Sequence, residues 1–85
     1  MAWTESAQKL ERTFTFNNFI DAFSWMTSMA IEVEKMNHHP EWNNVYNKVH
    51  VQLTTHDAGN KVTQKDRDLA QKMDQHYTKF IWATP

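Results

Sequence analysis

Two adjacent histidines near the middle of the chain are the residues best suited to chemistry. His38 and His39 are followed by Pro40, and Glu34 lies four residues before the first of them. A third histidine, His56, follows a segment with the alternation of a strand. Imidazoles can give and take protons near neutral pH, so histidines gathered where elements end point to general acid–base catalysis.

The spacing of these residues divides their expected roles. Glu34 and His38 are four residues apart, which places them on one helical face, one turn from each other. This carboxylate and the negative end of the helix dipole both favour the charged imidazolium of His38. Pro40 biases His39 away from helical geometry. We therefore expect the adjacent histidines to point in different directions and do different jobs, while His56 reaches the same pocket from the side.

Zinc binding and plain structural roles are the alternatives. Three histidines could ligate a catalytic zinc ion, but the common zinc motif, with two histidines four apart on one helix, is absent. His50 and His76 lie inside a strand pattern and a helix pattern, so we expect them to be structural or solvent-facing. Trp42 could stack on a planar ligand or fill the core, and from the residues alone we favour the core.

A helix is expected directly before the histidines, from about Phe19 to Met36. Asn18 is a good N-cap, and Asp21 completes a capping-box pattern. Asn37 can adopt the left-handed conformation that closes a helix. Further apolar residues widen the helix surface, so we expect it to pack on a sheet and also to meet another subunit. The predicted apolar stripe, as core or interface, consists of Phe19, Phe23, Met26, Ala30 and Val33.

Strand patterns lie on both sides of this helix. Residues 3–16 alternate as a strand with a weaker hairpin partner, and residues 41–45 and 48–54 form a second hairpin. A helix pattern over residues 62–80 follows and begins with another capping-box sequence. The predicted fold is α+β, a four-stranded antiparallel sheet with the helices packed on one face, in β-β-α-β-β-α order.

Length and composition narrow the class of protein. The 85 residues predict a single domain over residues 1–85, with a core so small that we expect a homo-oligomer. The net charge is −1, with neither a basic patch for nucleic acid nor a membrane anchor, and no signal-peptide pattern opens the chain. With no cysteine and one glycine, disulfides and phosphate-cradling loops are excluded. A soluble cytoplasmic protein is the default expectation.

The histidine segment resembles a known family, the pterin-4a-carbinolamine dehydratases. The family hallmark is a Glu, three residues, His-His-Pro, a Tyr or Trp six residues after the Pro, a further His and then an Asp. Here it reads Glu34, His38-His39-Pro40, Tyr46, His56 and Asp66. The resemblance extends over nearly the whole chain, from about Trp3 to the second helix.

The resemblance implies a dehydratase that converts 4a-hydroxytetrahydropterin to quinonoid dihydropterin plus water, in support of tetrahydrobiopterin recycling. It implies no metal and no organic cofactor. His38 and His56 would act as general acid and base, with Glu34 orienting His38 or the substrate, and His39 would bind and orient the pterin. The residues implied to line the pterin pocket, with Trp42 as a further candidate, are His38, His39, Pro40, Thr55, His56, Asp57 and Ala58. Asp66, three residues after Thr63, is expected to cap the second helix rather than touch substrate.

The resemblance also implies partners, and the sequence departs from the family pattern at its start and after His56. Family members form dimers or tetramers, with sheets joined edge to edge and helices bundled across the other interface. Some also stabilise dimers of a homeodomain transcription factor, so a non-catalytic interaction module, nuclear as well as cytoplasmic, is the alternative function. We expect no direct contact with nucleic acid or membrane. We expect the domain to lack the helix that usually precedes the residue matching Trp3. We also expect the segment between Trp3 and Phe16 to be shorter than usual and the loop after His56 to be about one residue longer.

Overall fold

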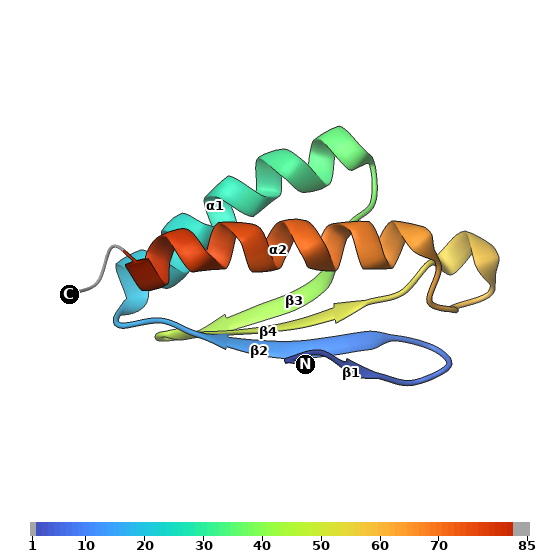
Figure 1. Cartoon of the computed structure of the whole chain (residues 1–85), viewed down its shortest axis with the longest axis horizontal. Helices are drawn as coiled ribbons and strands as arrows, with labels where there is room; N and C mark the ends of the chain where they lie inside the picture. The colour runs from blue at the N-terminus through green and yellow to red at the C-terminus, as the bar shows by residue number, and fades with distance from the viewer. Residues whose placement is uncertain (1, 83–85) are drawn as a thin grey trace.

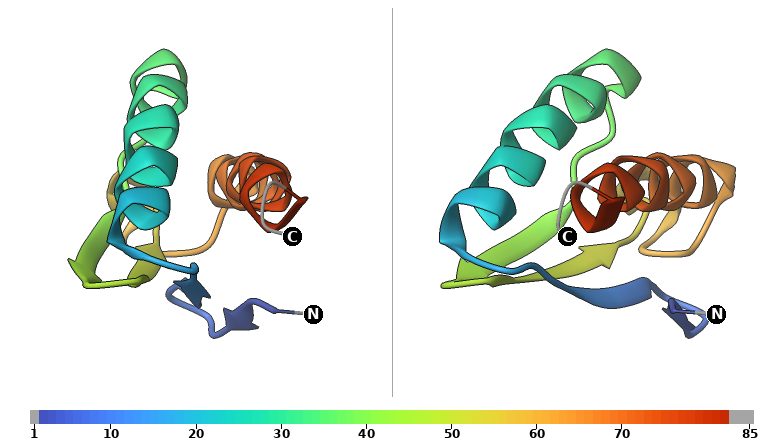
Figure 2. Two further views of the ribbon diagram at one scale, coloured as in Figure 1. Left: turned by 90° about the vertical axis from the view of Figure 1, so that its left-hand side faces the viewer. Right: turned by 60° about the vertical axis from the view of Figure 1, so that its left-hand side comes forward.

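The computed structural model describes the backbone of residues 2–82 and the side chains of residues 2–80. The sheet has the strand order β1-β2-β4-β3, and every neighbouring pair is antiparallel. Both helices lie on one face of this sheet (Figure 1; Figure 2), so the predicted fold class and element order are confirmed. In chain order the elements are β1 (Thr4–Glu5), β2 (Leu10–Thr15), α1 (Phe19–Met36), β3 (Glu41–Val45), β4 (Lys48–Leu53), the 3-10 helix η1 (His56–Ala58) and α2 (Gln64–Trp82).

One ionic cluster fastens the first hairpin to α2. Arg12 lies on the helix-covered face of β2, where its guanidinium sits 4.2 Å from the centroid of the Phe14 ring. Its Nη1 donates to the Asp74 carboxylate at 2.6 Å, and Trp3 Nε1 donates to the same carboxylate at 2.9 Å. A charged residue can therefore occupy the buried side of this strand, because its planar group stacks on aromatic rings and its charge is paired.

Helix α1 begins and ends where its capping residues predict. The Asn18 side chain accepts a hydrogen bond from the backbone N–H of Asp21 at 2.8 Å. Asn37 has a φ of 51° and a ψ of 43°, and its N–H bonds back to carbonyls of the last turn. The left-handed residue stops the helix and turns the chain toward β3.

Most of the stripe of α1 predicted as core or interface does not face the core, so its role in an interface stays a prediction. Phe19 and Phe23 are 46% and 55% exposed. The helix instead buries a neighbouring stripe, which overlaps the predicted one at Val33 and consists of Ala22, Trp25, Met29 and Val33. This helix is apolar on more than one side, so periodicity alone could not choose between two adjacent stripes.

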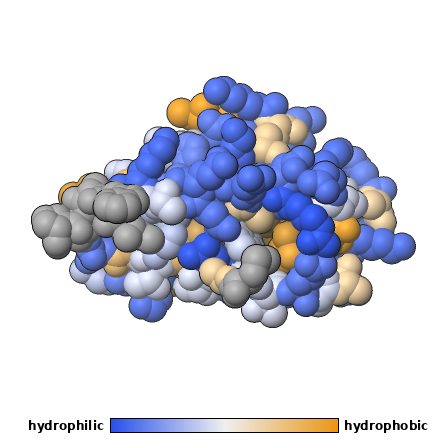
Figure 3. Space-filling view, in the orientation of Figure 1, coloured by the Kyte–Doolittle hydropathy of each residue, from blue (hydrophilic) through white to orange (hydrophobic). Residues whose placement is uncertain are grey.

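Helix α2 covers the part of the sheet nearer β2. It buries Leu69, Ala70 and Met73, and the hydroxyl of Tyr77 donates to the carbonyl of Thr15 at 2.6 Å. The face of the molecule that carries α2 is mostly hydrophilic (Figure 3). None of the helices in the part of the chain that the structure describes is long and apolar enough to cross a membrane.

Two connections, from α1 to β3 and from β4 to α2, lie at one end of the molecule. The end of α1, the start of β3, the end of β4 and the start of α2 all lie on the right in Figure 1. The hairpin register pairs Glu41 at the start of β3 with Gln52 near the end of β4. The fold therefore brings residues 37–41 and residues 54–66 together at this end.

Substitutions on the two sides of α1 test the observed orientation of this helix. Met29 is fully buried, so Met29→Ala should lower the free energy of unfolding by about 2–5 kcal/mol. Phe23→Ala removes a larger but exposed side chain and should cost less than about 1 kcal/mol in the monomer. Urea unfolding at several protein concentrations measures both values and separates any contribution from self-association. Equal losses in the two variants at high dilution would contradict the orientation.

Candidate active site

His38 sits at the junction between α1 and β3 and is almost completely buried. Its Nε2 lies 2.6 Å from Oδ1 of Asp66, a fully buried carboxylate in the first turn of α2. Because a carboxylate oxygen accepts, Nε2 carries the hydrogen of this bond, which leaves Nδ1 as the nitrogen available for proton exchange. His38 and Asp66 thus form a buried imidazole–carboxylate pair.

The expected pairing of Glu34 with His38 is not what the structure shows. Glu34 Oε1 lies 3.0 Å from Nε2 of His39 instead, in a pair that is largely exposed to solvent. The helical i,i+4 rule does not apply, since Asn37 has already left the helix with its positive φ. The left-handed turn sends His38 inward to Asp66 and His39 outward to Glu34, so the two histidines do point in different directions, as predicted.

Asp66 receives hydrogen bonds from three segments of the chain. Besides His38, the hydroxyl of Thr55 donates to its Oδ2 at 2.7 Å, and the backbone N–H of Thr63 donates to the same oxygen at 2.8 Å. The last contact is the predicted cap of α2, which is confirmed. The contact between Asp66 and His38 was not predicted, because a capping pattern in the sequence indicates only the bond to the nearby backbone N–H.

These hydrogen bonds decide the protonation of Asp66. Burial by itself raises the pKa of this carboxyl, but the bonds from His38, from the Thr63 N–H and from the Thr55 hydroxyl favour the carboxylate more strongly. The net result is a pKa below the ordinary value for an aspartate. Asp66 is therefore an anion at neutral pH, and it holds the His38 ring in one orientation.

His56 approaches from the other side, in the first residue of η1. Its Nδ1 lies 2.7 Å from Oδ1 of Asn60, and its Nε2 lies 3.4 Å from Oε2 of Glu41. Unlike His38, this ring is well exposed to solvent. The two candidate catalytic histidines consequently differ in environment: one is buried against a carboxylate, and the other is open to water.

A cavity of about 220 Å³ joins the histidines, and its lining includes His38, His39, Thr55, His56 and Asp57. The remaining lining residues, none of them predicted, are Asn37, Thr54 and Lys65.

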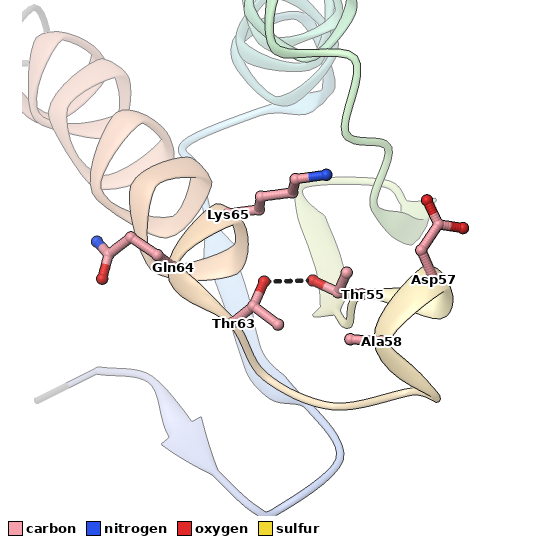
Figure 4. A pocket seen from close by; sticks show the side chains of 6 residues that line it. All are labelled: Thr55, Asp57, Ala58, Thr63, Gln64 and Lys65. Carbon is pink, nitrogen blue, oxygen red and sulfur yellow. Dashed lines mark hydrogen bonds between the residues drawn. The ribbon is translucent and has the colours of Figure 1, made fainter.

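A second cleft of about 350 Å³ adjoins the first and shares Thr55, Asp57 and Lys65 with it (Figure 4). Ala58 lines this second cleft. In Figure 4, Lys65 extends from the first turn of α2 past Thr55, on the side where Asp57 lies. The two hollows together form an open groove around Thr55.

The structure separates some predicted pocket residues from this groove. Trp42 packs against the core, with its ring centroid 6.1 Å from that of Trp25, and Pro40 does not line either cleft. Glu34 reaches the cavity only through its bond to His39. The other histidines lie elsewhere, as predicted: His50 pairs with Glu11 on the open sheet face, and His76 lies between the helices.

The predicted alternative for the three histidines is a metal site. Across residues 2–80, whose side chains are described, no three His, Asp or Glu side chains form a group that could hold a metal ion. His38, His39 and His56 each have a different oxygen partner.

Comparison with known proteins gives a consistent family. A sequence profile described as Pterin 4 alpha carbinolamine dehydratase matches residues 1–76. A relative from Roseobacter denitrificans that bears the name pterin-4-alpha-carbinolamine dehydratase is 57% identical over 70 residues, which cover 82% of this chain and 70% of that protein. A relative of the same name from Solibacter usitatus is 55% identical over 73 residues, covering 86% of this chain and 76% of that protein.

Solved structures have the same fold. A transcriptional coactivator/pterin dehydratase from Brucella melitensis superposes with a TM-score of 0.84 at 40% identity, covering 89% of this chain and 82% of that one. A pterin dehydratase-like protein described as a RuBisCO assembly factor of the alpha-carboxysome superposes with a TM-score of 0.73 over 88% of this chain and 86% of that one. At 17% identity, this second likeness concerns the fold alone.

The charge on Asp66 should be visible in the acid stability of the protein. The unfolded carboxyl takes up its proton at higher pH than the folded one, so this contribution is fully present above about pH 4 and is lost as the pH falls through the lowered folded pKa. Asp66→Asn should lower the free energy of unfolding by about 1–3 kcal/mol near neutral pH and flatten its decline in acid. Urea unfolding across the acid range measures both effects.

Asp68→Asn is the matched control for this change. Asp68 lies in the same helix on an exposed position, where its carboxylate accepts a hydrogen bond only from the Gln64 side chain among the bonds described. If the free energy of unfolding fell as steeply in acid for Asp66→Asn as for the unmodified protein, a group other than Asp66 would be responsible for the acid dependence.

Proposed function

Since the chain belongs to the pterin 4 alpha carbinolamine dehydratase family, we propose that it dehydrates 4a-hydroxytetrahydropterin to quinonoid dihydropterin by histidine acid–base catalysis. The observation that carries the proposal is the pair of histidines with different surroundings on one small cavity, His38 locked to a buried carboxylate and His56 open to water. The wider role would be the recycling of tetrahydropterin cofactors.

The reaction needs two proton transfers and no redox step. The bond between C4a and the hydroxyl oxygen breaks, a proton joins that oxygen to release water, and the proton on N5 leaves as a double bond forms between C4a and N5. One group must therefore donate a proton and another must accept one. At the end of the cycle the donor has to regain a proton and the acceptor has to lose one.

We assign the base to His38. Its neutral ring carries a hydrogen on Nε2, held by Asp66, so Nδ1 has a free lone pair for the proton that leaves the pterin. When His38 becomes an imidazolium, the adjacent Asp66 carboxylate stabilises the positive charge, as in other His–Asp pairs. Burial of the pair keeps this attraction from being screened by water.

We assign the acid to His56. Both of its ring nitrogens lie near oxygen atoms, of Asn60 and of Glu41, so the doubly protonated ring has an acceptor at each side. Exposure of the ring lets water return a proton after each turnover. His39, which pairs with Glu34, lines the same cavity and would contact and orient the pterin ring.

The size of the site suits a small bicyclic substrate. The histidine cavity, at about 220 Å³, is below the usual 300–1,000 Å³ of drug-sized pockets, and the adjoining cleft leaves room for a substituent on the pterin. The proposed chemistry assigns both proton transfers to side chains of this chain, so we propose that neither a metal nor an organic cofactor takes part.

Alanine substitutions test the assignment of the two histidines. His38→Ala and His56→Ala should each lower the rate of dehydration of a synthetic 4a-carbinolamine by on the order of 10²-fold, because a positioned proton donor or acceptor is lost. Stopped-flow absorbance of the quinonoid product measures the rate, and circular dichroism checks that both variants fold.

His50→Ala is the matched control, since His50 also bonds a glutamate but lies on the open face of the sheet. It should retain the full rate. Near-complete activity in both site variants would refute the catalytic assignment. Loss of activity after exhaustive chelation, with recovery on addition of zinc, would refute the proposal that no metal is involved.

The second candidate function is a protein-interaction module that stabilises a transcription-factor dimer. The observation that favours an interaction surface is the exposed apolar side of α1, where Ile20, Phe23 and Ile31 are 72%, 55% and 57% exposed. The same surface would serve self-association, which we propose for this chain as a dimer or tetramer. The related structure from Brucella melitensis is described as a transcriptional coactivator/pterin dehydratase, which supports considering both functions for this chain.

The mass of the particle in solution tests the proposed self-association. A chain of 10.1 kDa should elute at a multiple of that mass in light-scattering chromatography, because burial of the apolar side of α1 favours association. Ile20→Lys together with Phe23→Lys should shift the particle to smaller masses without unfolding it. A stable monomer at micromolar concentration in the unmodified protein would contradict this part of the proposal.

A further inference from the structure

The loop after β4 is wound tightly around one carbonyl. The Thr55 carbonyl accepts hydrogen bonds from the N–H groups of Ala58, Asn60 and Lys61, at 3.2, 3.1 and 3.4 Å. Two successive residues, Gly59 and Asn60, have positive φ values of 82° and 60°, which reverse the chain direction. Asparagine is one of the few residues other than glycine that adopts this conformation readily.

This winding returns the Asn60 side chain to the histidine that begins the loop. Asn60 Oδ1 lies 2.7 Å from His56 Nδ1, a short distance for a nitrogen–oxygen hydrogen bond. An amide oxygen only accepts, so Nδ1 is the donor and keeps its hydrogen. The remaining nitrogen, Nε2, is then the atom that can exchange a proton with another molecule.

A residue from the neighbouring strand faces that second nitrogen. Glu41, the first residue of β3, places Oε2 at 3.4 Å from His56 Nε2. The antiparallel register brings this glutamate to the end of β4, from which the η1 loop continues. The distance is slightly longer than a good hydrogen bond, so the carboxylate attracts the ring without using up the Nε2 hydrogen.

We propose that Asn60 and Glu41 are positioning residues that fix the orientation and tautomer of His56, so that Nε2 is its proton-exchanging nitrogen. This inference rests on the proposed dehydration for its catalytic consequence, in which Nε2 gives its proton to the leaving C4a hydroxyl. The two histidines then work through opposite atoms: His38 through Nδ1, because Asp66 holds its Nε2, and His56 through Nε2, because Asn60 holds its Nδ1.

Stability alone does not account for these contacts. The side chains of His56 and Glu41 are 63% and 59% exposed, and ion pairs as open as this one contribute little to folding. Other charged groups do share the cavity, namely Asp57 and Lys65 with His38 and His39, but no described hydrogen bond links any of them to the His56 ring. Asn60 and Glu41 are thus the residues that set its position.

The first experiment removes the acceptor without disturbing the backbone. Asn60→Gly keeps a residue that tolerates the positive φ, whereas alanine would add strain. We expect kcat to fall by about tenfold with KM within about twofold, because the substrate still binds but the donor nitrogen is no longer fixed. Asn60→Asp restores an oxygen acceptor in a residue that also tolerates positive φ, and it should recover most of the lost kcat.

The second variant acts on the other nitrogen. Glu41→Gln keeps the size of the side chain and removes its charge, and kcat should fall by about threefold, as expected for an exposed pair. Glu11→Gln is its matched control, since Glu11 lies 2.8 Å from His50 in a glutamate–histidine pair outside the cavity. This control should leave kcat and KM unchanged.

Ring nitrogen NMR of the free protein supplies a readout that does not depend on activity. At a pH where His56 is neutral, its nitrogen shifts should report the Nδ1–H tautomer in the unmodified protein and a tautomer mixture in Asn60→Gly. Unchanged shifts and unchanged kcat in Asn60→Gly would overturn the positioning role. An Nδ1–H tautomer that Asn60→Gly abolishes, in a protein that does not dehydrate the carbinolamine, would overturn the proposed function and leave the positioning of His56 standing.

Discussion

The carboxylate of Asp66 has no contact with solvent, and a charge in that place is tolerated only if hydrogen-bond donors surround it. The donors come from three separate places: His38 after α1, Thr55 after β4, and the backbone of Thr63 before α2. Each of these residues must hold its position for the carboxylate to remain charged. The same anion therefore closes the start of α2, ties down the loop that carries His56 and fixes the ring of His38.

This arrangement couples the chemistry of the site to the stability of the fold. A hydroxyl chain runs from Thr63 through Thr55 to Asp66, because the Thr55 hydroxyl donates to the carboxylate and accepts from Thr63. Buried polar networks of this kind are stable only when every member is satisfied. No buried side-chain nitrogen or oxygen in the described residues lacks a partner, which fits such a fully satisfied network.

Local sequence signals were sufficient to predict the helices and strands, but they were insufficient to predict the contacts between these elements. Asn18 and Asn37 predicted both ends of α1 correctly, because a cap acts on the backbone beside it. The sequence left open whether the predicted stripe of α1 belongs to the core or to an interface, since the buried stripe depends on which side of the helix meets the sheet. The Glu34–His38 pair failed for a related reason: helical spacing was extended one residue past a left-handed cap. The contact between His38 and Asp66 spans 28 residues and leaves no periodic trace in the sequence.

The left-handed conformation of Asn37 has a consequence for how this site can vary. After this left-handed residue, His38 is buried against Asp66 and His39 is exposed beside Glu34, although both line the cavity and the two side chains are chemically identical. A residue with a branched side chain would resist that angle, on which the directions of both imidazoles depend. Asn37 lines the cavity, but its backbone conformation affects the site more than its side chain does, because it sets the directions of the two histidines that follow. Variation at this position should therefore be confined to asparagine, glycine and aspartate by chain geometry, whatever ligand the groove accepts.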